Sequence, residues 1–165
     1  MIHEATKKHS QVNGFLRTVS ASQHRSYRVH LTDDLLGKNL NALSKHLQGR
    51  RSLLVTTPTV AELYGLELQE KLKSLSIDVS CLTLDVDEET KSIENVLAIC
   101  EETQRLQFAR QSVLIGMGGG VCTDLVTMAA SLIRRGIPYI RIPTTLLGQV
   151  DGSIGVLVSY SGDDG

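Results

Sequence analysis

A run rich in glycine, Gly116-Met117-Gly118-Gly119-Gly120, is the part of this sequence best suited to chemistry. It lies between an apolar run at residues 112–115 and a helix-like segment at residues 121–134. Glycine lets a ligand approach the backbone closely, and the free N–H groups of a following helix attract phosphate. A tight turn would need only one or two glycines. The sequence therefore predicts a site for a phosphorylated ligand.

The run does not match either of the common glycine motifs for nucleotides. In the dinucleotide fingerprint GxGxxG, Val121 would stand where the third glycine belongs. The P-loop requires a Gly-Lys-Ser/Thr ending, which is absent. The glycines thus indicate a phosphate site without naming its class.

Polar residues follow at later points where strands end or helices begin. Asp124 is expected in the first turn of the helix, Thr144 and Thr145 follow Pro143, and Asp151 comes after a short apolar turn. Each of these residues could cap a helix or balance its dipole. In open α/β sheets, however, ligands bind at the carboxyl ends of strands. Because these polar residues follow the ends of neighbouring strands, the pattern favours one shared site.

The elements that must position these residues alternate along the chain. Strands are expected at residues 27–31, 52–56, 77–84, 112–115 and 139–142, and helices at 35–47, 59–72, 91–108 and 121–134. This alternation predicts the α/β class, with a Rossmann-like, doubly wound parallel sheet flanked by helices. Residues 1–25 are expected to form a flexible arm, with a basic mitochondrial-type leader as the less favoured alternative.

The composition bounds the partners and the setting. The chain has 165 residues, 41% of them hydrophobic, with 17 basic against 18 acidic residues. That balance favours neither nucleic acid nor an anionic membrane as a partner, and no apolar run is long enough to span a bilayer. Cys81, Cys100 and Cys122 are too few and too far apart for a disulfide framework or a zinc knuckle. We expect three small buried cysteines and a reducing, cytoplasmic setting.

A longer pattern resembles a known family. Gly118-Gly119-Gly120-Val121-x-x-Asp124, followed by the run RGIPYIRIPTTLLGxxD at residues 135–151, resembles the sugar phosphate cyclase superfamily, which includes the dehydroquinate synthases and relatives that make valiolone-type cyclitols. The resemblance covers roughly residues 26–155. It implies an α/β half that binds NAD, a helical half that binds a metal, and a homodimer.

The resemblance also implies roles for individual residues. Glu88 and Lys91 resemble the family's acidic-residue-to-lysine step on the adenosine side of NAD, and Thr57 and Thr59 occupy places where relatives often carry Asp and Asn. The implied NAD contacts are Thr57, Thr59, Glu88, Lys91, Gly119, Gly120, Val121, Asp124, Thr144, Thr145 and Leu147, and Asp151 is the implied catalytic residue near the reacting hydroxyl.

The activity implied is cyclisation of a sugar phosphate with loss of phosphate. NAD oxidises a substrate hydroxyl transiently, and a divalent metal, zinc or cobalt, polarises substrate oxygens. The turn Asp151-Gly152-Ser153 and the Arg134-Arg135-Gly136 context are more similar to 2-epi-5-epi-valiolone synthases, which use sedoheptulose 7-phosphate. A 3-dehydroquinate synthase, an iron-dependent alcohol dehydrogenase relative and a non-catalytic NAD-binding partner of a full-length cyclase stay open as alternatives.

The similarity is expected to end near residue 156. Leu157 stands where the family places a lysine, and residues 156–165 read as a divergent tail behind an NAD-binding domain at residues 26–155. The Glu and two His that hold the family's metal are not found, and none of the five histidines is assigned to a metal. We therefore expect a fragment that binds NAD without turnover.

Overall fold

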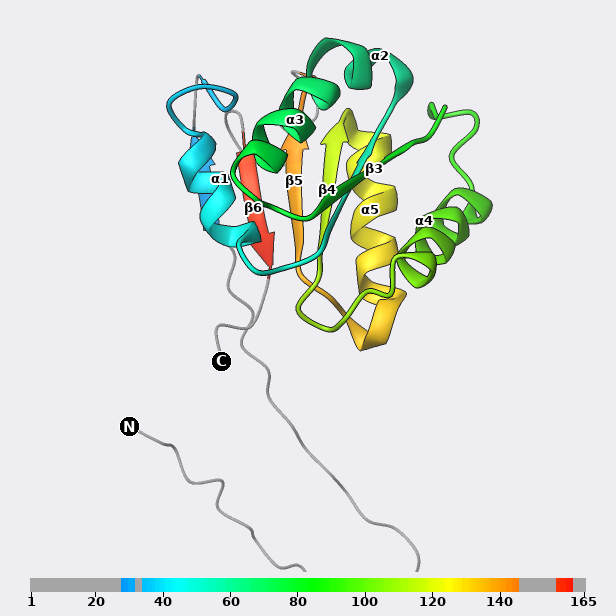
Figure 1. The fold of residues 1–165 in the computed structure, drawn as a ribbon. Helices are drawn as coiled ribbons and strands as arrows, with labels where there is room; N and C mark the ends of the chain where they lie inside the picture. Colours follow the sequence, from blue (N-terminus) through cyan, green and yellow to red (C-terminus); the bar gives the residue numbers. More distant parts are fainter. Residues whose placement is uncertain (1–27, 32–33, 146–156, 162–165) are drawn as a thin grey trace, which may run out of the picture.

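The structure, a computed structural model, describes residues 28–31, 34–145 and 157–161 (Figure 1). Its centre is a six-stranded sheet with the strand order β1-β6-β5-β4-β2-β3. The strands are β1 Arg28–Leu31, β2 Ser52–Thr56, β3 Val79–Thr83, β4 Val113–Gly118, β5 Tyr139–Pro143 and β6 Leu157–Ser161. The helices are α1 Leu40–Leu47, α2 Pro58–Val60, the π-helical η1 Ala61–Gly65, α3 Leu66–Ser74, α4 Ile93–Arg105, α5 Gly120–Leu132 and the 3-10 turn η2 Ile133–Arg135.

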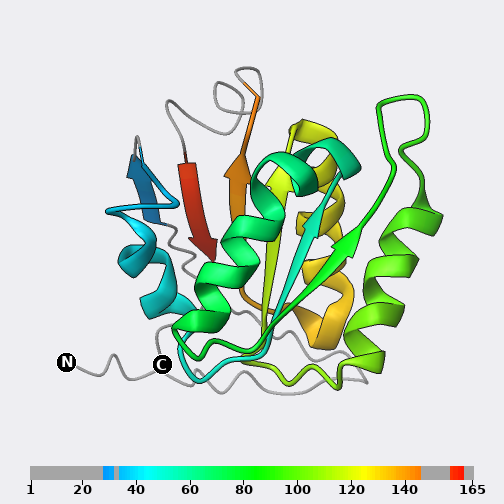
Figure 2. The same ribbon diagram turned by 45° about the horizontal axis from the view of Figure 1, so that its top comes forward.

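Four neighbouring strands of the sheet run parallel. β2 pairs with β3 on one side and with β4 on the other, and β4 pairs with β5. Helices α1 and α3 cover one face of this sheet, and α4 and α5 cover the other (Figures 1 and 2). Every residue of β2 and β4 is buried, as expected for parallel strands covered on both faces. The predicted α/β class with a helix-flanked parallel sheet is confirmed.

The last strand, β6, was not predicted. It pairs antiparallel with β5 and with β1, for example Tyr139 opposite Ser161 and Leu31 opposite Leu157. Val158 and Tyr160 in this segment are of types that favour strands. The sheet therefore continues past residue 155, into the part of the chain that we expected to be a divergent tail.

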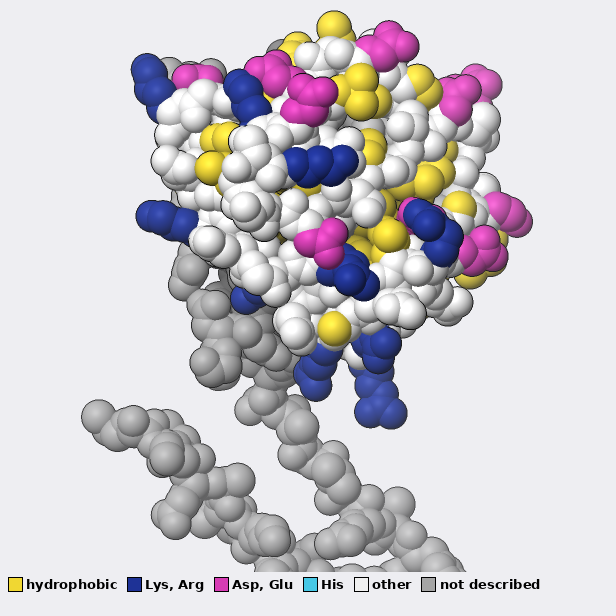
Figure 3. Space-filling view, viewed as in Figure 1, with side chains coloured by type: hydrophobic (Ala, Val, Ile, Leu, Met, Phe, Trp, Pro, Cys, Tyr) yellow, Lys and Arg dark blue, Asp and Glu magenta, His cyan; other side chains and the backbone are white. Residues whose placement is uncertain are grey.

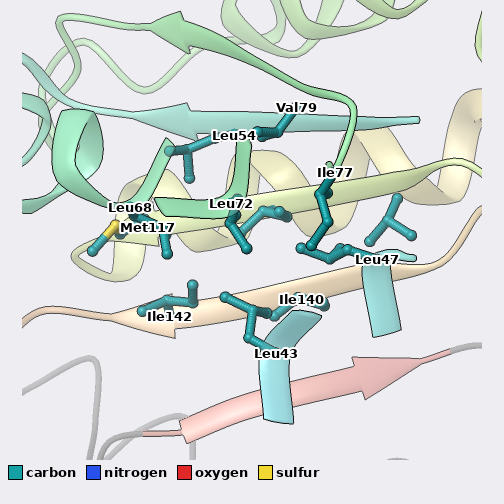
Figure 4. Close-up of a cluster of buried hydrophobic side chains, with 12 residues drawn as sticks. Leu43, Leu47, Leu54, Leu68, Leu72, Ile77, Val79, Met117, Ile140 and Ile142 are labelled. Atoms are coloured by element: carbon teal, nitrogen blue, oxygen red, sulfur yellow. The ribbon is translucent and has the colours of Figure 1, made fainter. Parts of the chain in front are cut away.

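The first hydrophobic core cluster lies between the sheet and helices α1 and α3 (Figure 4). Leu43 and Leu47 on α1, and Leu68 and Leu72 on α3, are spaced four residues apart and point at the sheet, where Leu54 lies among them. The spacing explains why these segments are helical: it places the apolar side chains of each helix on one stripe.

The second cluster lies on the opposite face, under α4 and α5. Leu53 and Val55 of β2 alternate with Leu54 and so point to this face, where they meet Ile99 of α4 and Val126 of α5. The two clusters together fix β2 and β4 in the middle of the molecule, which makes their carboxyl ends rigid supports for the loops that follow.

Helix limits differ from prediction in two places. The predicted helix at residues 35–47 begins only at Leu40, because the Asp34 side chain accepts the N–H of Lys38 at 3.1 Å and the preceding residues form turns. The helix predicted from Thr59 begins one residue earlier, with Pro58 at its first position, and contains the unpredicted π-helical η1. Among the described ranges, no helix is long and apolar enough to cross a membrane.

Candidate ligand site at the carboxyl edge of the sheet

The carboxyl ends of the parallel strands share one edge, at the top of Figure 1. Register brings Thr56 of β2 opposite Met117 of β4, and Gly118 of β4 opposite Pro143 of β5. Four connections follow the strands at this edge: residue 57, residues 84–92, residue 119 and residues 144–145. The described residues predicted for the site all lie on these loops or on the helix starts that follow them.

The glycines of the central loop divide into two kinds. A Cβ on Gly116 would lie 3.1 Å from the Cβ of Val126, and a Cβ on Gly118 would lie 2.9 Å from the Cβ of Cys122. Close packing of α5 on β4 therefore explains both. A Cβ on Gly120, which is exposed, would meet nothing within 4 Å. The protein's own packing gives no reason for glycine at that position, whereas a ligand approaching from outside would.

Helix α5 starts at this loop without a side-chain cap. Gly119 is its N-cap residue, and it has an extended backbone (φ −73, ψ −176). The buried Thr123 stabilises the turn instead, because its Oγ1 donates to the carbonyls of Gly119 at 3.2 Å and Gly120 at 3.0 Å. The first N–H groups of a helix have no intrahelical partner, so this end can accept an anion.

Thr144 and Thr145 close the neighbouring side of the loop. The N–H of Thr144 donates to the carbonyl of Gly118 at 2.9 Å, which ties the end of β5 to the end of β4. A Cβ built on Gly119 would lie 3.4 Å from the Thr145 Cγ2. We call Gly119, Gly120, Thr144 and Thr145 the glycine cradle. Their backbone groups and hydroxyls form one polar surface at the start of α5.

An ion pair joins the next loop to α5. The Lys91 Nζ lies 3.0 Å from the Asp124 Oδ2, and both side chains are partly exposed, 34% and 57%. The hydrogen bond to Asp124 raises the pKa of Lys91 above its ordinary value, with a smaller contribution from the charge of Glu88. Asp124 is the fifth residue of α5 and not part of its first turn, contrary to expectation, because the helix already begins at Gly120.

The loop that carries Glu88 and Lys91 is held by its own hydrogen bonds. The Asp87 Oδ1 accepts the N–H of Glu89 at 3.0 Å, and the N–H and hydroxyl of Thr90, both at 2.8 Å. These bonds, led by the hydroxyl of Thr90, lower the pKa of Asp87. The Asn95 Nδ2 donates to the Thr90 carbonyl at 2.8 Å. Sequence reasoning missed these three supporting residues, although Asp-x-x-Thr is a spacing typical of side-chain-stabilised turns.

Three threonines lie at the carboxyl end of β2, at the same edge of the sheet as the glycine cradle. Thr57 is the half-buried N-cap of α2 and makes no side-chain cap bond, and Thr59 is exposed one residue into that helix after Pro58. Thr56, not singled out from the sequence, has a fully buried Oγ1 without a hydrogen-bond partner among the described residues. The structure thus brings Thr57 and Thr59 to the same edge as the cradle.

Several predicted residues lie elsewhere. Leu147 and Asp151 lie outside the described residues. The cysteines are unpaired, but only Cys122 is fully buried; Cys81 and Cys100 are half-buried, which corrects the expectation of three buried thiols. In the part of the chain that the structure describes, no group of three metal-ligating side chains occurs. A pocket of about 460 Å³ lies away from the cradle, between the ends of α4 and α5, with Phe108 and Arg134 in its lining.

Comparison with known proteins agrees with the resemblance. The family model 3-dehydroquinate synthase N-terminal matches residues 81–161. The 3-dehydroquinate synthase of Agrobacterium fabrum (strain C58) is 37% identical over 131 residues, which are 79% of this chain and 35% of that protein. The structure of ValA, the 2-epi-5-epi-valiolone synthase from Streptomyces hygroscopicus subsp. jinggangensis 5008 with NAD+ and Zn2+ bound, has 37% identity and a TM-score of 0.75, covering 84% of this chain and 38% of that one.

An iron-containing alcohol dehydrogenase shares the fold alone, with 24% identity and a TM-score of 0.53 over 73% of this chain and 38% of that one. The glycine cradle at the carboxyl edge and these matches define the class of protein: the chain belongs to the sugar phosphate cyclase superfamily. It spans about a third of the length of the relatives it matches. The family match extends to residue 161 and so includes β6.

Proposed function

We propose that this chain forms the NAD-binding domain of a sugar phosphate cyclase. The observation that carries the proposal is Gly120, a glycine at the uncapped start of α5 whose missing side chain leaves open space. A diphosphate needs such close access to backbone N–H groups. NAD+ is bound in the related 2-epi-5-epi-valiolone synthase structure, which supports NAD as the ligand.

The described residues fit the parts of NAD as follows. The N–H groups of Gly119, Gly120 and Val121 hold the diphosphate at the start of α5, and Thr144 and Thr145 add hydroxyl contacts. The remaining residues proposed for the cofactor are Thr57, Thr59, Glu88, Lys91, Asp124 and, outside the described residues, Leu147. NAD supplies the chemistry of the first step, because transient oxidation of a substrate hydroxyl to a ketone makes the adjacent C–H acidic.

The rest of the reaction belongs to the whole protein. We propose Asp151 as the group near the reacting hydroxyl, a divalent metal such as zinc or cobalt as the Lewis acid, and a homodimer in the cytoplasm as the working form. The 165-residue chain alone is proposed to bind NAD without eliminating phosphate. Release of phosphate from sedoheptulose 7-phosphate above the uncatalysed rate by this chain would contradict that part.

Two alternative activities are open for the whole protein, and they differ in substrate. The sequence Asp151-Gly152-Ser153 favours a valiolone-type cyclase acting on sedoheptulose 7-phosphate. The names of the sequence relatives favour 3-dehydroquinate synthase at least as strongly. The two are separated by testing whether the whole protein that carries this chain forms a valiolone or 3-dehydroquinate.

The cofactor proposal is tested with two alanine variants, one in the cradle and one beside it. Gly120→Ala places a methyl group where we expect the diphosphate, so affinity for NAD+ in titration calorimetry should fall at least tenfold, a loss of about 1.4 kcal/mol. Its thermal stability should stay equal or rise, because alanine is better than glycine in a helix by roughly 0.5–1 kcal/mol.

Gly118→Ala is the matched control. Its Cβ would lie 2.9 Å from the Cβ of Cys122, so the variant should lose stability, by about 1–3 kcal/mol as in other overpacked cores. Equal NAD+ affinity in Gly120→Ala and the unmodified chain would rule out the cradle as the diphosphate site.

A further inference from the structure

The pocket between the ends of α4 and α5 lies at the amino edge of the sheet, opposite the glycine cradle (Figures 1 and 2). Its volume of about 460 Å³ falls within the range of small-molecule sites, roughly 300–1,000 Å³. The apolar part of its lining consists of Cys100, Phe108, Leu132 and Ile133. The pocket can therefore take the apolar body of a small ligand, and the proposed NAD site does not use it.

The charge of the lining favours an anion. Among the described residues that line the pocket, Arg134 alone carries a formal charge. Its Nε donates to the carbonyl of Phe108 at 2.7 Å, which fixes the guanidinium at the pocket wall. Of the two acidic residues beside the pocket on α4, Glu102 is paired with Arg105 at 2.6 Å, and Glu101 does not line it. Basic side chains also gather at this lower end of the molecule in Figure 3, which attracts anions.

The backbone at the pocket supports a role for a second side chain. Gln107 has a φ of 53, in the left-handed region that residues with a Cβ seldom adopt. It directly follows Leu106, the C-cap of α4, at a position where glycine is the usual residue. Folding of this turn therefore gives no reason for a long polar side chain. A ligand that bonds to the amide of Gln107 in the pocket lining would give one.

We propose that this pocket is a second ligand site, which binds a small organic carboxylate with an apolar body, of the arylacetate type. The carboxylate pairs with the guanidinium of Arg134, whose planar N–H groups suit two parallel hydrogen bonds, and the amide of Gln107 adds a further bond. The apolar body packs on Phe108, Leu132 and Ile133. The site is separate from the glycine cradle and does not depend on the binding of NAD.

Phenylacetate and its neutral counterpart phenylacetamide test the site on the 165-residue chain. In an NMR titration, phenylacetate should shift the amides of Gln107, Phe108 and Ile133 saturably, with the millimolar dissociation constant typical of so small a molecule. Phenylacetamide should bind about threefold more weakly or worse, because it cannot form a charged pair with the guanidinium. Inorganic phosphate has the charge without the apolar body, so it should give no saturable shifts at the same concentrations.

Two neighbouring arginines provide a matched pair of variants. Arg135 lies in the same turn as Arg134 and also has a left-handed backbone, with a φ of 68, but it does not line the pocket. Arg134→Gln should lower the affinity for phenylacetate to that for phenylacetamide. Arg135→Gln should keep the preference for the carboxylate.

Gln107→Gly separates binding from stability. Glycine relieves the left-handed strain, so the melting temperature should stay equal or rise. The affinity for phenylacetate should nevertheless fall, by about twofold or more, because the amide is lost. Unchanged affinity in this variant would remove Gln107 from the site.

The cysteines supply a second readout. Cys100 lines the pocket, whereas Cys81 lies on β3 outside it, and both are half-buried free thiols. Saturating phenylacetate should slow the alkylation of Cys100 by iodoacetamide and leave the rate at Cys81 unchanged. Equal rates at Cys100 with and without phenylacetate would contradict occupation of the pocket.

The remaining outcomes decide the proposal independently of the cofactor. Equal affinity of the unmodified chain for phenylacetate and phenylacetamide, or equal losses in Arg134→Gln and Arg135→Gln, would overturn it. Saturating NAD+ should leave the affinity for phenylacetate unchanged, and competition between the two would show that the sites are not separate. Failure of the chain to bind NAD+ would overturn the proposed function and leave the carboxylate site standing.

Discussion

At the scale of single residues, the structure separates two reasons for glycine in one short loop. Gly116 and Gly118 are required by the side chains of Val126 and Cys122 that pack against them, whereas Gly120 is not required by any described neighbour. The sequence predicted a ligand from the number of glycines alone. The contacts leave Gly120 as the glycine for which we propose a ligand.

Among the residues that pack against these glycines, Cys122 has a pKa far above its ordinary value. It packs against Gly118, its Sγ lies 3.6 Å from the carbonyl oxygen of Val55, and burial raises its pKa to about 12 from an ordinary 9.0. A thiol whose pKa is raised in the folded state stays protonated while the unfolded chain ionises. The protein should therefore lose stability as pH rises above 9.0.

The predicted loss from this group is roughly 1.4 kcal/mol at pH 10 relative to pH 8, since a difference of one pKa unit corresponds to about 1.4 kcal/mol. Denaturant unfolding at pH 8 and pH 10 measures it, with Cys122→Ala as the reference for all other titrating groups. If the unmodified chain and Cys122→Ala lose the same stability over this range, the thiol is not buried as described.

At the scale of elements, the turn that ends α5 requires positive φ at three consecutive residues, the last of which is Gly136. The helix was predicted to reach Arg134 but ends at Leu132, and the chain then passes through positive φ at Arg134, Arg135 and Gly136. The Arg134 Nε donates to the Phe108 carbonyl at 2.7 Å, which helps to hold this turn. The turn redirects the chain into β5, which ends at the cradle.

Gly136→Ala should be strongly destabilising. Its φ of 112 with ψ of 126 lies outside the regions open to residues with a Cβ, and such strain costs on the order of 1–3 kcal/mol. The measurement is the free energy of unfolding in urea. Gly120→Ala is the comparison, because its backbone is helical; similar losses in both variants would mean that strain at Gly136 is not the cause.

The elements also show how far sequence reasoning reaches. The strand Ser52–Thr56 was predicted with its observed limits, because an uninterrupted apolar run is typical of a strand covered on both faces. The start of α1 was predicted wrongly, because the Asp34 side chain accepts the N–H of Lys38 and residues 35–39 form turns in place of the first helical turn. β6 was missed since its residues were judged by their departure from a motif and not by their preference for strands.

For the site, the glycine and threonine patterns predicted Gly120 and Thr144, and the family resemblance implied Lys91. The elements that carry all three end or begin at one edge of the sheet. The partner of Lys91 was not predictable. An ion pair across 33 residues depends on how α4 and α5 pack, and local spacing carries no signal of that packing.

At the scale of the whole molecule, the two core clusters hold the parallel strands rigid and leave chemistry to the loops at their carboxyl edge. Basic side chains project at the lower end of the molecule in Figure 3, and the 460 Å³ pocket between the ends of α4 and α5 lies away from the cradle. The size of this pocket would favour a ligand between the ends of α4 and α5, whereas the glycines and free helix N–H groups favour a ligand at the start of α5.

Binding of NAD+ at the glycine cradle is tested most directly by following the backbone amide shifts of the 165-residue chain in NMR spectra during a titration with NAD+. We expect the largest shifts at Gly119, Gly120 and Val121, with smaller ones at Thr144 and Lys91. Shifts centred on Phe108 and Arg134 at the far pocket, or no saturable shifts at millimolar NAD+, would contradict it.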